Sequence, residues 1–350
     1  MTTDVGIAAT EAALPRRHGR EARPLVLLGG LSLVMTALFA FSLVTGRGTV
    51  TGGLGDLFSL WQRDPDTAWL ILSQVRLPRT LLAALVGASL GLSGAVLQGL
   101  LRNPLAEPAL LGASSSAALG AVILFYFGAG GSSYLLPFGG MAGTLLATGL
   151  LFALGGRSQD TLTLVLAGVA INSLTGALTS LALNFAPSPY AAMEIVFWIL
   201  GSFADRTLDH VAMAAPLMFV GWALLLTTAR PLEAMTLGED TAATLGFDLR
   251  RVKLRAIIGT ALCVGAAVAV TGVVSFVGLV VPHLIRPFVG YRPGRLLVPS
   301  MLGGAALMLA ADIGVRLIST ALELKVGVVT ALIGAPFFLH LLAVLRRTRP

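Results

Sequence analysis

The feature that most constrains this chain is a series of long, continuous apolar segments. A helix rises ~1.5 Å per residue and the hydrocarbon layer of a bilayer is ~30 Å thick, so ~20 apolar residues cross it. The segments are continuous rather than alternating, which favours helices over a β-barrel. Only 12% of the 350 residues are charged, about half the share of a typical soluble domain. The sequence therefore predicts an all-α integral membrane protein.

The region 254–285 decides between nine spans and ten. Its apolar stretch is too long for one untilted helix, and Gly272, Gly278 and Pro282 interrupt it, so we divide it in two. The apolar piece 191–203 is too short to cross a bilayer, and we expect it to be interfacial or re-entrant. The sequence thus predicts a bundle of about ten transmembrane helices, over 25–44, 78–101, 109–127, 134–154, 161–185, 210–229, 254–271, 273–285, 296–320 and 326–345.

The basic residues give the orientation, because cytoplasmic loops are enriched in Lys and Arg. With ten spans and the first residue inside, 17 of the 24 Lys and Arg residues fall on the cytoplasmic side, and both termini lie there. This predicts a cytoplasmic arm over 1–24, a membrane domain over 25–345 with its longest cytoplasmic loop at 231–255, and a tail over 346–350. The arm is long and a full span follows it, so we interpret it as uncleaved. The seven basic residues on the other side are Arg47, Arg63, Arg76, Arg79, Arg206, Arg316 and Lys325.

Several classes of protein fit this sequence poorly. The single cysteine, Cys263, excludes an internal disulfide and a cysteine metal cluster, and the four histidines are scattered, so we expect no metal site and no cofactor. There is no H-E-x-x-H pattern, so we expect no catalytic residues. A secondary transporter usually buries ionisable groups at mid-membrane. Here Glu194 and Asp312 lie near span ends, so that class stays as an alternative only.

Small residues recur every four positions in two of the predicted spans. Such stripes let helix backbones approach closely in lipid. The stripe in span 78–101 indicates helix packing. The stripe in span 161–185 also carries polar groups, so it either packs the bundle or faces a translocation path, where we place Asn172 and Ser180. The two stripes are Gly87, Gly91, Ala95 and Gly99, and Gly168, Asn172, Gly176 and Ser180.

The longest cytoplasmic loop contains a short helix pattern. We expect a surface helix over 239–245, begun by Gly238 and ended by Gly246. Leu237 and Phe247 would be exposed apolar residues at its ends, which a solvated loop would not need. The pattern therefore predicts a helix that docks into a groove on a cytoplasmic partner.

Four stretches, in this order, resemble the FecCD family of permeases, and the resemblance covers roughly residues 25–345. That family imports siderophores, haem and cobalamin. The resemblance implies a homodimer with a pore at its interface in the bacterial inner membrane, two cytoplasmic ATP-binding subunits and a periplasmic substrate-binding protein. The stretches are RLPRTLLAALVGASLGLSGAVLQGLLRNPLAEPALLG at 76–112, GEDTAATLGFDLRRVK at 238–253, GVVSFVGLVVPHLIR at 272–286 and GVVTALIGAPFFLHLL at 327–342.

The resemblance also implies a cargo and a source of energy. The stretch at 188–207 is more similar to the haem and siderophore members than to the cobalamin members, so we expect an iron chelate, with cobalamin as the alternative. The sequence has no G-x-x-x-x-G-K-[ST] loop to bind ATP phosphates, in agreement with a separate ATPase subunit.

Three groups of residues acquire roles from the resemblance. Docking of the binding protein would fall to external arginines, with snorkelling to the lipid boundary as the other reading. The cytoplasmic gate would lie in the turn 155–161. By motif position, the docking residues are Arg76, Arg79 and Arg316. The gate, placed by the order of the spans, includes Ser158 and Thr161, and the residues that couple to the ATPase are Gly238, Glu239, Ala242, Leu245, Gly246, Arg250 and Arg251.

Overall fold

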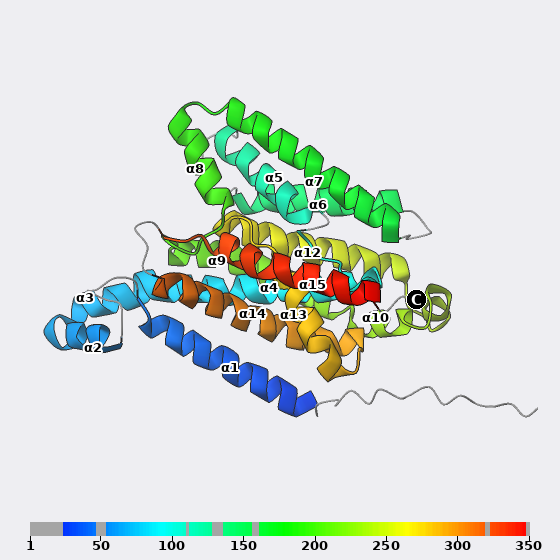
Figure 1. Ribbon diagram of the computed structural model, residues 1–350, viewed down its shortest axis with the longest axis horizontal. Helices are drawn as coiled ribbons and strands as arrows, with labels where there is room; N and C mark the ends of the chain where they lie inside the picture. The colour runs from blue at the N-terminus through cyan, green and yellow to red at the C-terminus, as the bar shows by residue number, and fades with distance from the viewer. Residues whose placement is uncertain are drawn as a thin grey trace, which may run out of the picture.

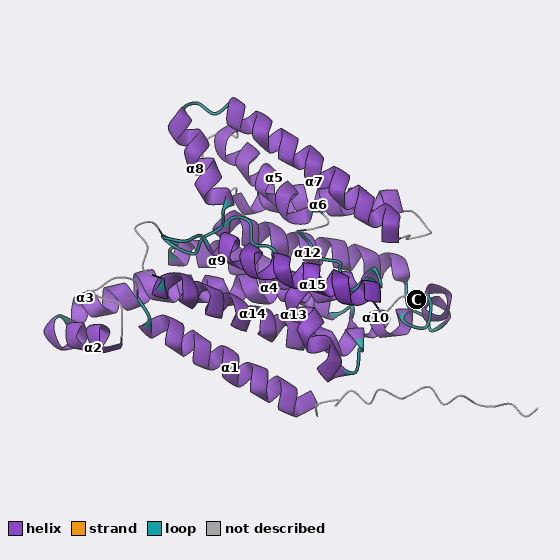
Figure 2. Cartoon of the chain, in the orientation of Figure 1, coloured by secondary structure: helices purple, strands orange, loops and turns teal. Residues whose placement is uncertain are grey.

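The computed structural model describes residues 24–46, 54–109, 112–127, 136–155, 161–318 and 323–347. Throughout these ranges the regular structure is helical and no strand occurs (Figure 2). The elements are α1 (Pro24–Val44), α2 (Leu54–Arg63), α3 (Pro65–Leu70), η1 (Ile71–Arg76, a π-helix), α4 (Leu77–Leu100), α5 (Ala113–Phe127), α6 (Leu136–Gly155), α7 (Thr161–Asn184), α8 (Pro189–Ile199), α9 (Leu208–Leu226), α10 (Ala229–Met235), α11 (Glu239–Thr244), α12 (Leu249–Thr271), α13 (Val277–Ile285), η3 (Arg286–Val289, a 3-10 helix), α14 (Pro293–Leu317) and α15 (Val326–Arg347).

Each of the ten predicted spans coincides with a helix, which confirms the predicted fold class. These helices are α1, α4, α5, α6, α7, α9, α12, α13, α14 and α15. Within the described ranges, six helical stretches are long and apolar enough to cross a membrane, and the remaining apolar helices are shorter. Helix α8 has only 11 residues, as expected for the apolar piece that is too short to cross. The chain is an all-α, multi-pass membrane protein.

The helices lie side by side along the long axis of the molecule (Figure 1). Helix α4 is central and packs most extensively against α14, with α12 and α13 on its other sides. Helices α5, α6 and α7 form a group that joins the rest through α12, and α1 packs on α14 at the opposite edge. We call the end that holds Arg76, Arg79 and Arg316 the arginine end (left in Figure 1), and the end that holds α10 and α11 the loop end (right).

Glycines allow α4 to approach its neighbours at backbone contact. A Cβ on Gly87 would lie 2.3 Å from the carbonyl oxygen of Gly304 in α14, and one on Gly94 would lie 2.0 Å from that of Gly278 in α13. Real Cβ atoms do not come so close, so only glycine fits at these crossings. Gly87 belongs to the predicted stripe in span 78–101, and a Cβ on Gly91 of the same stripe would lie 2.2 Å from Ser300 O in α14, so the stripe packs helices as predicted.

The chain breaks between α12 and α13, where the two-span prediction required it. Gly272 and Phe276 both have positive φ, 75° and 69°, and they bound a non-helical segment. Two backbone hydrogen bonds join this break to the end of α8 and the residues after it: the N–H of Ser202 donates to Thr271 O at the end of α12 at 2.8 Å, and that of Val273 donates to Ile199 O at the end of α8 at 3.1 Å. Non-helical backbone at membrane depth needs such internal partners. The predicted cause was partly wrong, because Gly278 and Pro282 both lie inside α13.

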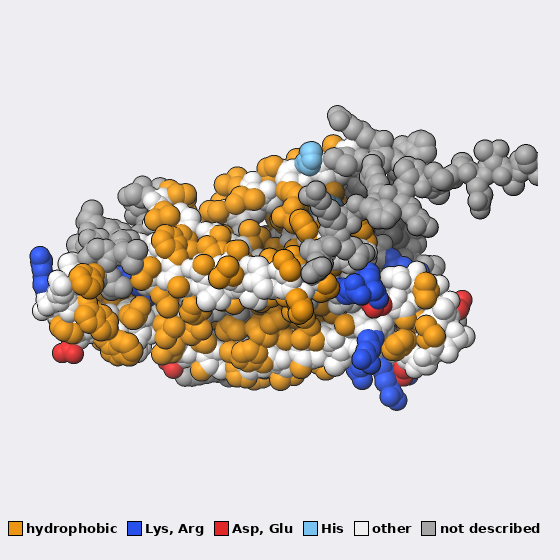
Figure 3. All heavy atoms as spheres, turned by 90° about the horizontal axis from the view of Figure 1, so that it is seen from below, with side chains coloured by type: hydrophobic (Ala, Val, Ile, Leu, Met, Phe, Trp, Pro, Cys, Tyr) orange, Lys and Arg blue, Asp and Glu red, His pale blue; other side chains and the backbone are white. Residues whose placement is uncertain are grey.

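The outer surface is suited to lipid along the body of the bundle. Figure 3 shows one face covered by hydrophobic side chains, with Lys and Arg gathered toward the ends. Large apolar side chains such as Leu33, Leu146 and Leu332 are mostly exposed. In water such a surface would drive aggregation, whereas in a bilayer it is solvated by acyl chains.

Candidate functional site

At the arginine end, Arg76 caps the end of α1. It is the last residue of η1, is 3% exposed, and its Nη1 donates to the carbonyl oxygens of Leu43 at 3.0 Å and Val44 at 2.7 Å. The last carbonyls of a helix have no partner within the helix, and a basic side chain is a suitable donor for them. Arg76 thus ties α1 to the start of α4.

Arg316 reaches the neighbouring carbonyls at the end of α1 from α14. Its Nη1 donates to Ser42 O at 2.8 Å and to Thr45 O at 2.6 Å, and its Nη2 also bonds to Ser42 Oγ. One turn earlier in α14, Asp312 accepts from Arg316 Nη2 at 2.8 Å. Two arginines on different helices therefore satisfy the end of α1.

Arg79 completes a network of charged groups. Its Nη2 donates to Asp312 at 2.7 Å and to Glu323, just before α15, at 2.5 Å. Asp312 is fully buried between Arg79 and Arg316. We call Arg76, Arg79, Asp312, Arg316 and Glu323 the arginine network. Three cations and two carboxylates leave it with one net positive charge.

The structure brings the three predicted docking arginines together, but it places them inside the protein. They hold α1, α4, α14 and the start of α15 to one another, whereas a rim charge or a snorkelling anchor would extend outward. Their role in docking stays a prediction. Sequence reasoning missed Glu323 and the α1 carbonyls as partners. The ion pair between Asp312 and Arg316 could have been predicted from the sequence, because residues four positions apart on a helix lie next to each other.

At the loop end, the predicted surface helix is present as α11. Gly238 precedes it with φ 118° and Gly246 follows it with φ 88°, so both glycines occupy backbone conformations that other residues rarely adopt. Ala242 is fully buried against the bundle, and Leu237 and Leu245 are 69% and 59% exposed. The helix and its boundaries are therefore confirmed, and it presents two leucines to the outside.

One expectation for this loop was wrong. Phe247 is not an exposed apolar end, because it is partly buried and packs on the hydrophobic core. Lys253 of α12 pairs with Glu239 at 3.5 Å, which links α11 to α12. Arg250 is exposed, and Arg251 pairs with Asp248 at 3.0 Å. All seven predicted coupling residues lie in α11, its two flanks or the first turn of α12.

The residues predicted for the path or gate are not gathered in one place. Ser158 lies outside the described residues, and Thr161 begins α7, where its side chain is not described. Asn172 connects α7 to the preceding helices: its Oδ1 accepts from Ser115 Oγ at 2.6 Å and its Nδ2 donates to Ala109 O at 3.3 Å. The structure thus places Asn172 between helices rather than on an open surface.

Ser180 belongs to an exposed polar strip on another face of α7. Its hydroxyl donates to Gly176 O at 3.0 Å, and Asn184 donates to Ser180 O at 2.9 Å. Ser173 lies on the same face, because positions 173, 176, 180 and 184 follow the helical repeat. We call Ser173, Gly176, Ser180 and Asn184 the α7 polar strip. The sequence analysis identified two of its residues, Gly176 and Ser180, but not that they face the outside of the bundle.

Comparison with known proteins identifies what this bundle is similar to. The FecCD transport family model matches residues 33–344. The hemin transport system permease protein HmuU of Yersinia pestis is 37% identical over 333 residues, which cover 93% of this chain and 98% of that protein. The cobalamin import system permease protein BtuC of Halobacterium salinarum is 42% identical over 281 residues, with 79% and 74% covered.

Further similarity is found in another curated relative and in a solved structure. The Fe(3+) dicitrate transport system permease protein FecD of Escherichia coli is 38% identical over 294 residues, which cover 83% of this chain and 90% of that protein. A solved structure, described as an inward-facing conformation of a transporter assigned to the metal-chelate type of ABC transporters, aligns with a TM-score of 0.77 at 34% identity. It covers 89% of this chain and 97% of that one. The chain belongs to the FecCD transport family.

Proposed function

We propose that this chain is the membrane permease subunit of an ATP-driven importer that carries an iron chelate, either haem or a ferric siderophore, across a bacterial inner membrane. The observation that carries the proposal is full-length similarity to import permeases combined with α11, a short helix that exposes two leucines at one end of the bundle. The proposed orientation has both termini and α11 in the cytoplasm, where 17 of the 24 basic residues would lie.

In this proposal α11 is the contact for the ATPase subunits. Leu237 and Leu245 would enter a groove on the partner, as apolar anchors of a docked helix do. The buried Ala242 and the Glu239–Lys253 ion pair attach α11 to α12. Helix α12 packs on α4, α6 and α9. Movement of the ATPase would therefore reach the centre of the bundle through α12.

The arginine end is the proposed contact for the substrate-binding protein. The arginine network has one net positive charge, which attracts carboxylates on a partner and orients its approach. Because Arg79 already binds Asp312 and Glu323, a carboxylate of the binding protein would have to share or replace these partners. Docking would then act directly on the start of α15.

The α7 polar strip is the proposed lining of the translocation path. Hydroxyl and amide groups exposed on a membrane helix are poorly solvated by acyl chains and usually face a water-filled cavity or another subunit. In a homodimer, the strips of two subunits would face the same pore. Alternating access would then move this pore between its two open sides, with no covalent chemistry in this chain.

Two alternatives concern cargo and energy. Cobalamin is the alternative cargo, because BtuC of Halobacterium salinarum is 42% identical to this chain. A self-sufficient secondary transporter is the alternative class. It would need an ionisable group free to bind an ion in mid-membrane, whereas Asp312 is held between Arg79 and Arg316 at one end of the bundle.

The test is uptake by membrane vesicles that hold this chain, its ATPase and its binding protein. Haem, a ferric siderophore and cobalamin are offered in parallel, with and without ATP. We expect ATP-dependent accumulation of haem or the siderophore. Accumulation of cobalamin alone would show that the cargo is cobalamin and not an iron chelate. Accumulation without the ATPase and the binding protein would show that the chain is a self-sufficient secondary transporter.

A further inference from the structure

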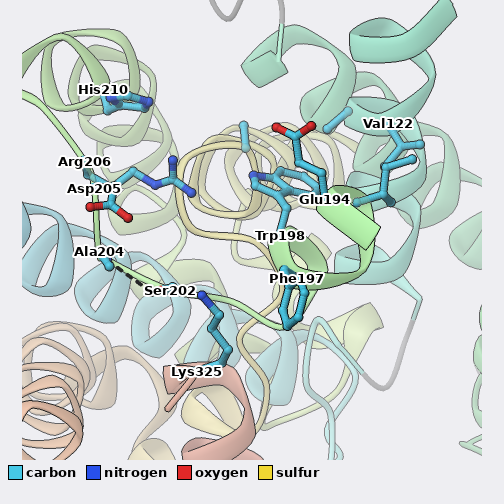
Figure 4. A pocket seen from close by; sticks show the side chains of 13 residues that line it. Val122, Glu194, Phe197, Trp198, Ser202, Ala204, Asp205, Arg206, His210 and Lys325 are labelled. Atoms are coloured by element: carbon cyan, nitrogen blue, oxygen red, sulfur yellow. Dashed lines mark hydrogen bonds between the residues drawn. The ribbon is translucent and has the colours of Figure 1, made fainter. Parts of the chain in front are cut away.

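A cavity of about 470 Å³ opens between helices at the arginine end, apart from the arginine network. Its walls come from α5, α8, the connection from α8 to α9, the first turn of α9, the end of α12 and the residue before α15. Figure 4 shows its charged and aromatic side chains from close by. A concave space of this size is typical of a small-molecule site rather than of a flat protein contact.

Arg206 is the central cation of this cavity. It follows a tight turn in which the N–H of Ala204 donates to Ser202 Oγ at 3.1 Å and Asp205 has a φ of 57°. This turn directs the guanidinium of Arg206 toward Trp198 (Figure 4). The Nε of Arg206 is buried and has no hydrogen-bond partner among the described residues. Such a donor is costly to leave unbonded, so it calls for an acceptor.

Arg206 stays positively charged in this environment, and its neighbours do not fully neutralise it. Burial lowers the pKa of Arg206, and the neighbouring Asp205 acts in the opposite direction. An arginine stays charged even after such a shift. Asp205 is itself exposed, so solvent screens its charge. A guanidinium can bind a carboxylate through two parallel hydrogen bonds. This contact is stronger when the guanidinium is partly buried than when it is exposed to solvent.

Two further side chains complete the site. Lys325 supplies a second cation from the segment before α15, on the side of the cavity opposite Glu194 (Figure 4). Trp198 supplies an aromatic face between them. His210 does not compete for the ligand through its Nδ1, because that atom accepts the N–H of Thr207 at 3.2 Å and closes the start of α9.

We propose that this cavity binds the carboxylate-bearing edge of the transported chelate, with Arg206 and Lys325 on the carboxylate and Trp198 against the adjoining ring or alkyl group. The inference rests on the proposed function and names its substrate class. The negative charges of Glu194 and Asp205 balance the positive charges of Arg206 and Lys325. The site therefore favours a single carboxylate in a defined position over a ligand that carries many negative charges. Haem and citrate have free carboxylates, whereas the corrin side chains of cobalamin are amides.

The test measures binding to the full chain in lipid nanodiscs, by quenching of tryptophan fluorescence. The probes are haemin, its dimethyl ester, ferric citrate and cobalamin. The ester keeps the macrocycle of haemin and removes its carboxylate charges. The variants are Arg206→Gln, Arg206→Lys and Lys325→Gln. Arg63→Gln is the matched control, because Arg63 is exposed at the same end and does not line the cavity.

We expect Arg206→Gln to raise the Kd of a carboxylate-bearing probe by roughly tenfold or more, the loss for one charge-assisted hydrogen bond. Lys325→Gln should weaken the same probe, Arg206→Lys should restore part of the affinity, and the ester should bind all variants alike. Arg63→Gln should bind as the wild type does.

Several results would overturn the proposal. One is a wild-type protein that binds neither haemin nor ferric citrate more tightly than cobalamin. Another is an unchanged Kd in Arg206→Gln. A third is weaker capture of the binding protein by the variants with no change for the probes, which would make the cavity a protein contact. The binding assay contains no ATPase, so it can succeed where the vesicle test of the importer fails, and the reverse.

Discussion

Arg79 and Asp312 form a two-pronged ion pair between α4 and α14 at the arginine end. The Nε of Arg79 donates to both carboxylate oxygens, at 3.0 and 3.1 Å, and its Nη2 donates to Oδ1 at 2.7 Å. Such paired geometry is stronger and more directional than a single contact. Asp312 also holds Arg316, so one fully buried carboxylate fixes two arginines.

Replacing Asp312 should therefore destabilise the protein strongly. Asp312→Asn keeps the side-chain shape but leaves the buried Arg316 without its counter-charge and Arg79 with Glu323 only. The cost of an uncompensated buried charge is roughly 3–5 kcal/mol. The measurement is the apparent Tm in detergent. Glu323→Gln is the control, because Glu323 pairs with Arg79 and is partly exposed, so its loss should be clearly smaller. Equal losses in both variants would contradict the central position of Asp312.

Gly94 should tolerate no side chain. In Gly94→Ala the new methyl group would lie 2.0 Å from the carbonyl oxygen of Gly278, so α4 and α13 must separate. Overpacking of this kind costs roughly 1–3 kcal/mol, which lowers the Tm. Gly149→Ala in α6 is the matched control, because nothing lies within 4 Å of its new methyl group. That variant should keep or raise the Tm through helix propensity. A stable Gly94→Ala would show that the crossing is looser than described.

Glu107 should make stability depend on pH. It is buried in the connection between α4 and α5 and accepts from the backbone of Phe276 and Gly278, and burial raises its pKa from 4.5 to about 8. The folded protein therefore holds a proton that the unfolded chain releases at lower pH. The stability from this group is complete below pH 4.5 and is lost as pH rises through about 8.

The comparison for Glu107 is the Glu107→Gln variant, which cannot ionise. The Tm of the wild type should fall relative to that of the variant as pH rises between about 4.5 and 8. Other groups titrate alike in both proteins, so the difference isolates Glu107. Parallel curves over this range would refute the assignment.

Leu245 should matter for coupling and not for folding. Leu245→Gln removes an exposed apolar side chain, so the Tm should change little. If Leu245 becomes buried against the ATPase, its loss should weaken that contact by roughly tenfold or more, and ATP-dependent uptake should fall with it. Leu70→Gln is the control, because Leu70 has the same 59% exposure at the other end of the bundle. Normal uptake and ATPase binding in Leu245→Gln would exclude Leu245 from the contact.

The elements were predictable because their signals are local. The apolar run of each span, the break near Gly272 and the short helix at Glu239 all appear within a single stretch of chain. Phe247 was misplaced because its burial depends on packing against the hydrophobic core, which the local pattern of residues does not show. The α7 polar strip was found only in part, since a four-residue stripe indicates a face but not what that face meets.

The sequence by itself determined that this chain is helical, crosses the membrane about ten times and belongs with one family of permeases, because length, hydropathy and motif order are properties of contiguous residues. Only the tertiary structure decided what the charged groups do. Arg79 and Glu323 are far apart in the chain, and the unbonded Nε of Arg206 is visible only inside a cavity built from six segments. The reason is physical: the energy of a charge depends on its burial and its partners, and both are set by packing between distant parts of the chain.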